Sequence, residues 1–147
     1  MIPAGDLVLL DTSVLIHLLR DTSLGKRILK EQALETRAEK PVISVVTVGE
    51  LLAFAKKRGW GTRKIERLEE LVSSIVVADI RPRPILDKYA EIDAFCEANG
   101  RALGKNDLWI AATAAATNAT LVTADKDFDP LAGEHIKRVY YDPRGTY

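Results

Sequence analysis

Leu-Val-Leu-Leu-Asp-Thr-Ser, residues 7–13, is the stretch that decides the fold of this chain. Four apolar residues in a row are typical of a strand that is buried on both faces, as strands in parallel sheets are. The run ends at Asp11, and two small hydroxyl residues follow it. Ligands of open parallel sheets bind beyond the carboxyl ends of the strands, so Asp11 marks the edge at which we expect a functional site.

Four further short runs share this apolar, β-branched character and are expected to be strands: residues 41–46, 75–77, 120–123 and 137–140. Between the runs, apolar residues recur every three or four positions, which indicates amphipathic helices. These helical stripes begin at Val14, Leu24, Val48, Ile65, Ile85 and Leu108. Strands that alternate with helices imply right-handed crossovers. The sequence therefore predicts a three-layer α/β fold, with a mostly parallel central sheet of four to five strands and helices on both faces.

The size and composition of the chain are those of one ordinary globular domain. It has 147 residues, 47% of them apolar and 29% charged, which predicts a single domain over residues 1–147. No apolar run approaches the ~18 to 20 residues that a membrane span needs, and the N-terminus lacks the basic region of a secretory signal. Cys96 is the only cysteine, which excludes an internal disulfide and a Cys-based zinc cluster. We therefore expect a cytoplasmic protein that does not contact a membrane.

The charges balance, with 21 basic and 21 acidic residues, so contact with a nucleic acid must come from local clustering. One cluster stands out: Lys56, Lys57, Arg58, Arg63, Lys64 and Arg67. It is a solvated helix face, a surface that follows an RNA backbone, or, with Trp60, Leu68 and Leu71, a groove for a partner protein or a dimer contact. The alternation of cations with aromatic residues and leucines favours the partner groove.

Acidic residues recur at the predicted carboxyl ends of the strands. Asp11 follows the first strand, Glu50 lies in the first turn of the helix after the second, Asp107 opens the sixth helix, and Asp125 follows the fourth strand. Each alone is explained by a helix cap, a capping box or the helix dipole. Together in a partly dry site they would repel one another, unless they share protons or surround a cation.

The chemistry of these donors indicates which cation they would surround. Ligand sets made only of oxygen favour Mg²⁺ or Mn²⁺ over zinc. Such an ion suits phosphodiester hydrolysis, because it polarises the phosphoryl group and lowers the pKa of an attacking water.

Four motifs in this order resemble those of the PIN-domain ribonucleases, especially the VapC-type toxins of toxin–antitoxin pairs. They are Leu-Leu-Asp-Thr-Ser (9–13), Thr-Val-Gly-Glu-Leu (47–51), Asn-Asp-Leu-Trp-Ile-Ala-Ala (106–112) and Leu-Val-Thr-Ala-Asp-Lys-Asp-Phe (121–128). The resemblance implies a single PIN-like nuclease domain with Mg²⁺- or Mn²⁺-dependent endoribonuclease activity on RNA. It also implies a homodimer that is inhibited by a separately encoded cognate antitoxin, which would contact the helices of the basic cluster.

The same resemblance implies roles for individual residues. The catalytic and metal-binding set would be Asp11, Glu50, Asp107 and Asp125, supported by the polar residues Thr12, Ser13, Asn106 and Thr123. Asp11 and Asp107 would hold the principal metal, while Glu50 and Asp125 would bind it directly or through water. Asp127 and Asp129 follow closely, and whether either of them replaces or joins Asp125 is left open, as is the number of metal ions.

Other functions compete with the toxin interpretation. A PIN nuclease of RNA processing or repair would have the same site without an antitoxin, and a neighbouring small open reading frame would distinguish the two. A non-catalytic RNA-binding or partner-binding module would have a degenerate site, against which the complete acidic set argues. A receiver-type phosphoacceptor domain also places acids at strand ends, but the lysine-bearing strand end that such domains need is not found beside these acids. We expect His17 and His135 to be ordinary helix and loop residues, and Cys96 and Trp109 to belong to the core.

Overall fold

The computed structural model describes residues 1–145, in which five short strands alternate with six α-helices and one 3-10 helix. The strands are β1 (Val8–Leu10), β2 (Val42–Ser44), β3 (Val76–Ala78), β4 (Thr120–Thr123) and β5 (Lys137–Tyr140). The helices are α1 (Thr12–Leu19), α2 (Ser23–Glu31), α3 (Val45–Lys57), α4 (Thr62–Ser73), α5 (Arg83–Ala98), α6 (Lys105–Thr117) and the 3-10 helix η1 (Lys126–Leu131). Among these helices, none has both the length and the apolar character that a bilayer crossing requires.

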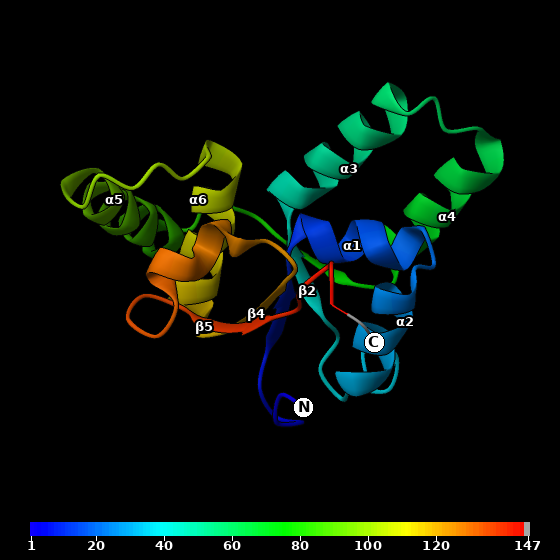
Figure 1. The fold of residues 1–147 in the computed structure, drawn as a ribbon, viewed down its shortest axis with the longest axis horizontal. Helices are drawn as coiled ribbons and strands as arrows, with labels where there is room; N and C mark the ends of the chain where they lie inside the picture. Colours follow the sequence, from blue (N-terminus) through cyan, green and yellow to red (C-terminus); the bar gives the residue numbers. More distant parts are fainter. Residues whose placement is uncertain (146–147) are drawn as a thin grey trace.

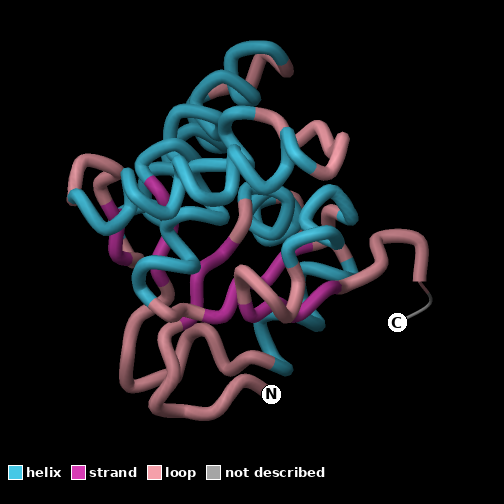
Figure 2. The backbone as a smooth tube through the Cα atoms, turned by 90° about the vertical axis from the view of Figure 1, so that its left-hand side faces the viewer, coloured by secondary structure: helices cyan, strands magenta, loops and turns pink. Residues whose placement is uncertain are grey.

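The strands form one sheet in the order β3-β2-β1-β4-β5, and every neighbouring pair is parallel. Figure 1 shows α5 and α6 grouped on one side of the molecule and α1, α2 and α4 on the other. Figure 2 shows the strands in the middle of the molecule with the helices around them. The predicted parallel sheet with helices on both faces is confirmed. Because the order of the strands reverses at β1, the crevice expected to bind ligands lies beyond the carboxyl ends of β1 and its neighbours.

Two apolar cores pack against the two faces of the sheet. Val8 and Leu10 contribute to the core that α1, α2, α3 and α4 cover, whereas Leu9 contributes to the core beneath α5, α6 and η1. Val122 and Leu121 of β4 divide in the same way, since successive side chains of a strand point to opposite faces. The continuous apolar runs of these strands therefore reflect burial on both faces.

The structure departs from the sequence expectations at β2 and β3. The run 41–46 does not stay extended, because α3 begins at Val45, and the side chain of Ser44 accepts a 3.1 Å hydrogen bond from the Val46 N–H as its cap. Glu50 consequently lies in the second turn of α3, not the first, and Thr47 is not a cap. Strand β3 is an edge strand whose valines are largely exposed, so the expectation of burial on both faces is wrong there.

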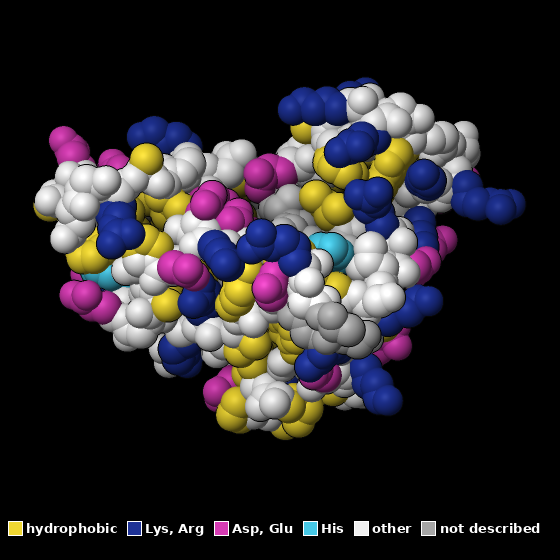
Figure 3. Space-filling model, in the orientation of Figure 1, with side chains coloured by type: hydrophobic (Ala, Val, Ile, Leu, Met, Phe, Trp, Pro, Cys, Tyr) yellow, Lys and Arg dark blue, Asp and Glu magenta, His cyan; other side chains and the backbone are white. Residues whose placement is uncertain are grey.

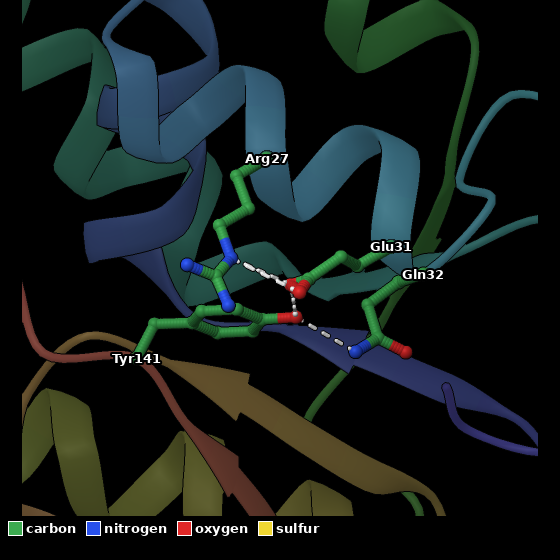
Figure 4. Close-up of polar contacts among 4 residues, drawn as sticks. All are labelled: Arg27, Glu31, Gln32 and Tyr141. Atoms are coloured by element: carbon green, nitrogen blue, oxygen red, sulfur yellow. Dashed lines mark hydrogen bonds and ion pairs between the residues drawn. The ribbon is translucent and has the colours of Figure 1, made fainter. Parts of the chain in front are cut away.

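A partly buried polar network links both ends of the described chain to the end of α2 (Figure 4). The Tyr141 hydroxyl, just beyond β5, accepts a 2.9 Å hydrogen bond from Gln32 Nε2 and donates one of 3.1 Å to Glu31 Oε2. Gln32 Oε1 accepts from the backbone N–H of Ile2 at 2.9 Å, and Arg27 pairs with the Glu31 carboxylate. The network holds the end of β5 and the N-terminal segment in place beside the sheet.

Candidate active site

Acidic side chains converge at the carboxyl ends of the strands. Asp11 follows β1, Asp125 follows β4, Asp107 lies in the first turn of α6, and Glu50 projects from α3. Figure 3 shows acidic side chains gathered near the middle of this face, between the α5–α6 side and α3. The parallel topology thus brings together residues that are far apart in the sequence.

Asp11 is the most buried of these acids, with only 3% of its surface exposed. Its Oδ2 atom accepts hydrogen bonds from Ser13 Oγ at 2.7 Å and from Thr123 Oγ1 at 2.8 Å. Burial raises the pKa of Asp11, these two hydrogen bonds oppose the rise, and the negative charge of Asp125 adds to it. Asp11 occupies the N-cap position of α1, but its side chain makes no capping bond. The carboxylate is therefore fixed toward the acidic cluster and does not serve the helix.

The two hydroxyls that hold this carboxylate also fix the chain that leaves β4. Ser13 Oγ accepts a hydrogen bond from the Ala124 N–H at 3.1 Å, and Thr123 Oγ1 accepts one from the Asp125 N–H at 2.9 Å. The Asp125 side chain in turn accepts from the Asp127 N–H at 2.9 Å and caps η1. The ends of β1 and β4 are thereby linked, which sets the position of Asp125 relative to its neighbours.

Glu50 is held by a pair of threonines. Thr12 Oγ1 donates a 2.7 Å hydrogen bond to Glu50 Oε1 and lies 3.0 Å from Thr47 Oγ1. Thr47 is wholly buried. Its motif was interpreted from the sequence as a helix cap, but it supports the residue that orients Glu50. The sequence gives no signal of this role, because the contact depends on how α1 packs against α3.

Of the acids in the cluster, Asp107 has the pKa that the other acids raise most. Burial, together with the negative charges of Asp11, Asp125, Glu50 and Asp127, raises the pKa of Asp107 to about 7. The other three acids of the predicted set thus all act on Asp107, as expected for carboxylates that share one site.

The structure distinguishes the two acids that follow Asp125. Carboxylate oxygens of Asp107, Asp125 and Asp127 all lie within 4.8 Å of one another. Asp129 instead forms an ion pair with Arg138 of β5. Asp127 therefore lies beside Asp125 in the cluster, and Asp129 is turned to another partner.

The remaining candidate residues lie around the cluster or away from it. Asn106 lines a groove together with Thr12 and Glu50. His17 Nδ1 lies 2.8 Å from Thr22 Oγ1, and the His135 ring packs 4.3 Å from that of Phe95, as expected for ordinary helix and loop residues. Cys96 is buried in the core on the α5–α6 side, as predicted, whereas Trp109 is only partly buried and stacks on Tyr89 at 4.0 Å.

The donor set fits a hard divalent cation. Its groups are carboxylates with supporting hydroxyls, and the group of mutually close ligand atoms found within residues 1–145 contains no His or Cys. Oxygen ligands of this kind suit Mg²⁺ or Mn²⁺. Burial, and then the charges of the neighbouring acids, raise the pKa of Asp107, and a bound cation would offset both effects.

Comparisons with known proteins point to one family. The family model of the PIN domain matches residues 8–134. The ribonuclease VapC2 of Haemophilus influenzae is 30% identical over 115 residues, which cover 78% of this chain and 83% of that protein. The ribonuclease VapC5 of Mycobacterium tuberculosis is 31% identical over 128 residues, covering 84% of this chain and 87% of that protein.

Solved structures of toxin–antitoxin complexes share the fold of this chain. VapBC2 of Rickettsia felis, bound to a promoter DNA fragment, superposes with a TM-score of 0.79 and 23% identity over 92% of this chain and 99% of that one. VapBC-5 of Mycobacterium tuberculosis, from a family of toxin–antitoxin systems, superposes with a TM-score of 0.69 and 26% identity over 95% of this chain and 100% of that one.

Proposed function

This chain belongs to the PIN-domain family, and we propose that it is a divalent-metal-dependent endoribonuclease, the toxin of a toxin–antitoxin pair. The observation that carries the proposal is the convergence of Asp11, Glu50, Asp107 and Asp125 at one edge of the sheet, where all the others raise the pKa of Asp107. The curated relatives named ribonucleases support the reaction class.

The metal would be held by Asp11, Asp107, Asp125 and Asp127, with Glu50 at the side of the cluster that α3 forms. When bound, Mg²⁺ or Mn²⁺ supplies polarisation of the phosphoryl group and an activated water for hydrolysis. Ser13 and Thr123 keep the Asp11 carboxylate in one orientation, so this ligand is preorganised before any ion arrives.

On the α3 side of the cluster, two threonines position Glu50. Thr12 directs the Glu50 carboxylate, and Thr47 fixes Thr12. Glu50 is thereby placed to orient the attacking water or to accept its hydrogen bond. Asn106, which lines the same groove, offers an amide donor to phosphate oxygens of the substrate.

A toxin of this type needs a protein inhibitor and, in our proposal, a second copy of itself. The solved VapBC-5 structure comes from a toxin–antitoxin family, which supports an antitoxin encoded beside this chain. The exposed Leu52 of α3 and, separately, the edge strand β3 with its exposed valines are apolar positions that a second copy would cover. Light scattering is expected to give the mass of two chains, and a neighbouring small open reading frame distinguishes a toxin from an RNA-processing nuclease.

RNA cleavage with a matched pair of variants tests the reaction. The wild type with Mg²⁺ is expected to cut a labelled single-stranded RNA internally, also where 2′-O-methyl groups block attack by the ribose, because water is the nucleophile. Asp107→Asn should abolish the cuts. Asp129→Asn should retain them, because Asp129 pairs with Arg138 outside the cluster. Cleavage that persists in EDTA, or that survives in Asp107→Asn, would overturn the proposal.

A further inference from the structure

A pocket of about 510 Å³ lies between α3 and α4 beside the end of α1. Its lining residues are Leu19, Arg20, Phe54, Arg58, Trp60, Arg63, Lys64 and Arg67, and we call it the basic aromatic pocket. Five of these residues are cations and none is an acid. Figure 3 shows basic and hydrophobic side chains side by side over α3 and α4. The pocket therefore suits an occupant that is anionic and that also has an apolar surface.

The apolar part of the pocket consists of Leu19 and two aromatic rings. Phe54 and Trp60 meet edge to face, with centroids 5.6 Å apart and an interplanar angle of 88°. The Arg58 guanidinium lies 5.0 Å from the centroid of Phe54, and Lys64 Nζ lies 5.7 Å from that of Trp60. Flat rings bordered by cations are the combination that holds bases and phosphates of single-stranded nucleic acids.

The leucines that would make this surface a helix-binding groove are not in the pocket. Leu68 is buried in the core at 1% exposure, and Leu71 lines a separate cavity with Leu18 and Leu29. The leucines of the sequence pattern that favoured a partner groove thus lie elsewhere, and the pocket keeps cations, two aromatic rings and the largely buried Leu19. Arg67 is bound to Asp21 through both of its terminal nitrogens, so it serves the fold, and the other cations remain for a ligand.

The pocket adjoins a groove that is lined by Glu50 of the acidic cluster. This groove of about 520 Å³ is lined by Thr12, Glu50 and Asn106 and extends to Phe54 and Lys57. Phe54 also lines the basic aromatic pocket, so the two hollows share a wall. Glu50 and Arg58 are two helical turns apart, ~12 Å along the axis of α3. An RNA strand with its scissile phosphate at the acids would reach the pocket within a few nucleotides.

We propose that the basic aromatic pocket is a subsite for one nucleotide of the RNA substrate, a few positions from the bond that is cut. This inference rests on the proposed function. Because the two rings are perpendicular, the base stacks on the face of Trp60 and meets Phe54 at its edge. The phosphates beside it pair with Arg58, Arg63 and Lys64. Stacking accepts any base and ion pairs accept any phosphate, so the subsite contributes affinity and register more than sequence preference.

Binding measured without cleavage tests the charged half of this subsite. The probe is a fluorescein-labelled 12-nucleotide single-stranded RNA, followed by anisotropy at several salt concentrations in an Asp107→Asn background. Arg58→Gln/Arg63→Gln/Lys64→Gln should weaken binding at least about tenfold and reduce the salt slope by about two, at roughly 0.7 per phosphate contact. The control Arg81→Gln/Arg101→Gln/Lys137→Gln removes as much charge from exposed positions elsewhere and should leave both quantities nearly unchanged.

Unchanged affinity and slope in the first triple variant would overturn the proposal and assign the pocket to a protein partner. A loss of equal size in the control would also overturn it, because the effect would then be one of net charge. Circular dichroism of each variant verifies that the fold is retained.

Cleavage of long and short RNA tests the aromatic half. Trp60→Leu keeps an apolar side chain against the core but loses the stacking face, whereas Trp60→Phe keeps an aromatic ring. In the wild type, kcat/KM should be higher for the 12-nucleotide RNA than for a trinucleotide that is too short to reach the pocket. Trp60→Leu should reduce this advantage roughly tenfold through KM, and Trp60→Phe should restore most of it. If Trp60→Leu keeps the higher kcat/KM for the 12-nucleotide RNA, the subsite is contradicted. If the wild type does not cleave RNA at all, the proposed function is refuted, and the binding measurement alone decides whether the subsite exists.

Discussion

The carboxylates of the site differ in the number of hydrogen bonds that they accept, as Asp11, Glu50 and Asp107 show. Asp11 accepts hydrogen bonds from two hydroxyls, and Glu50 accepts one. No hydrogen bond to the Asp107 carboxylate is found within residues 1–145, so Asp107 bears the repulsion of its neighbours without compensation. Burial and this repulsion together raise its pKa to about 7.

The stability of the metal-free protein should therefore depend on pH through Asp107. Its folded pKa of about 7 exceeds the ordinary value of 3.8, so the folded state binds a proton that the unfolded state releases. The free energy of unfolding should fall as the pH rises from about 4 to about 7. Asp107→Asn removes this dependence. Melting temperatures in EDTA between pH 5 and 8 should decline more steeply for the wild type than for the variant, and parallel curves would contradict the assignment.

Asp11, Asp107 and Asp125 were predictable from the sequence because each directly follows a strand or lies in the first turn of a helix, whereas Glu50 lies one turn deeper in α3 than expected. The choice between Asp127 and Asp129 was not predictable, since it depends on the turn of η1 and on Arg138 of β5. The role of Thr47 was also hidden, because it arises from a contact with Thr12 across two helices.

At the scale of elements, the turn between α1 and α2 depends on one glycine. Gly25 lies in the first turn of α2, where its N–H donates a 3.0 Å hydrogen bond to the cap residue Thr22. A Cβ at Gly25 would lie only 2.4 Å from the carbonyl oxygen of His17. The backbones of the two helices therefore meet at this point with no room for a side chain.

Gly25→Ala should consequently destabilise the protein by roughly 1–3 kcal/mol, although alanine favours a helix by about 1 kcal/mol over glycine. Gly49→Ala in α3 is the matched control, because nothing lies within 4 Å of its would-be Cβ. That change should stabilise the protein by about 0.5–1 kcal/mol. Urea unfolding measures both, and a neutral or stabilising Gly25→Ala would show that the helices separate easily.

All five strands were expected near the right residues, but the boundary between β2 and α3 was not. The β-branched run that includes Val45, Val46 and Val48 has strand propensity, and it is helical because Leu51 and Ala55 of the same segment pack into the core against the sheet. Tertiary packing of this kind is not visible in a local pattern. The 3-10 helix η1 was not expected either, although a helix cap was one of the interpretations of Asp125, which does cap it.

At the scale of the whole molecule, the site depends on the central sheet, beside which hydrogen bonds hold both ends of the chain in place. Gln32 is 3% exposed and connects the N-terminal segment with Tyr141 beyond β5 (Figure 4). Strand β5 pairs with β4, which ends at the acidic cluster. Loss of the network should therefore reduce stability without altering the cluster directly.

Tyr141→Phe should reduce the free energy of unfolding by about 1–3 kcal/mol, because the buried Gln32 amide loses its acceptor. Tyr89→Phe is the control, since the Tyr89 ring stacks on Trp109 and its hydroxyl has no hydrogen-bond partner in the part of the chain that the structure describes. Chemical denaturation compares the two. Equal effects of both changes would show that the network contributes nothing specific.

The proposed activity requires that the acidic cluster bind a divalent metal ion, and thermal unfolding with added Mn²⁺ measures this binding. A ligand that binds only the folded state at a hundredfold excess over its Kd stabilises that state by about 2.7 kcal/mol. The melting temperature of the wild type should rise with Mn²⁺ concentration and saturate, whereas that of Asp11→Asn/Asp107→Asn should not respond. An equal rise in both proteins, or none in the wild type, would contradict the assignment.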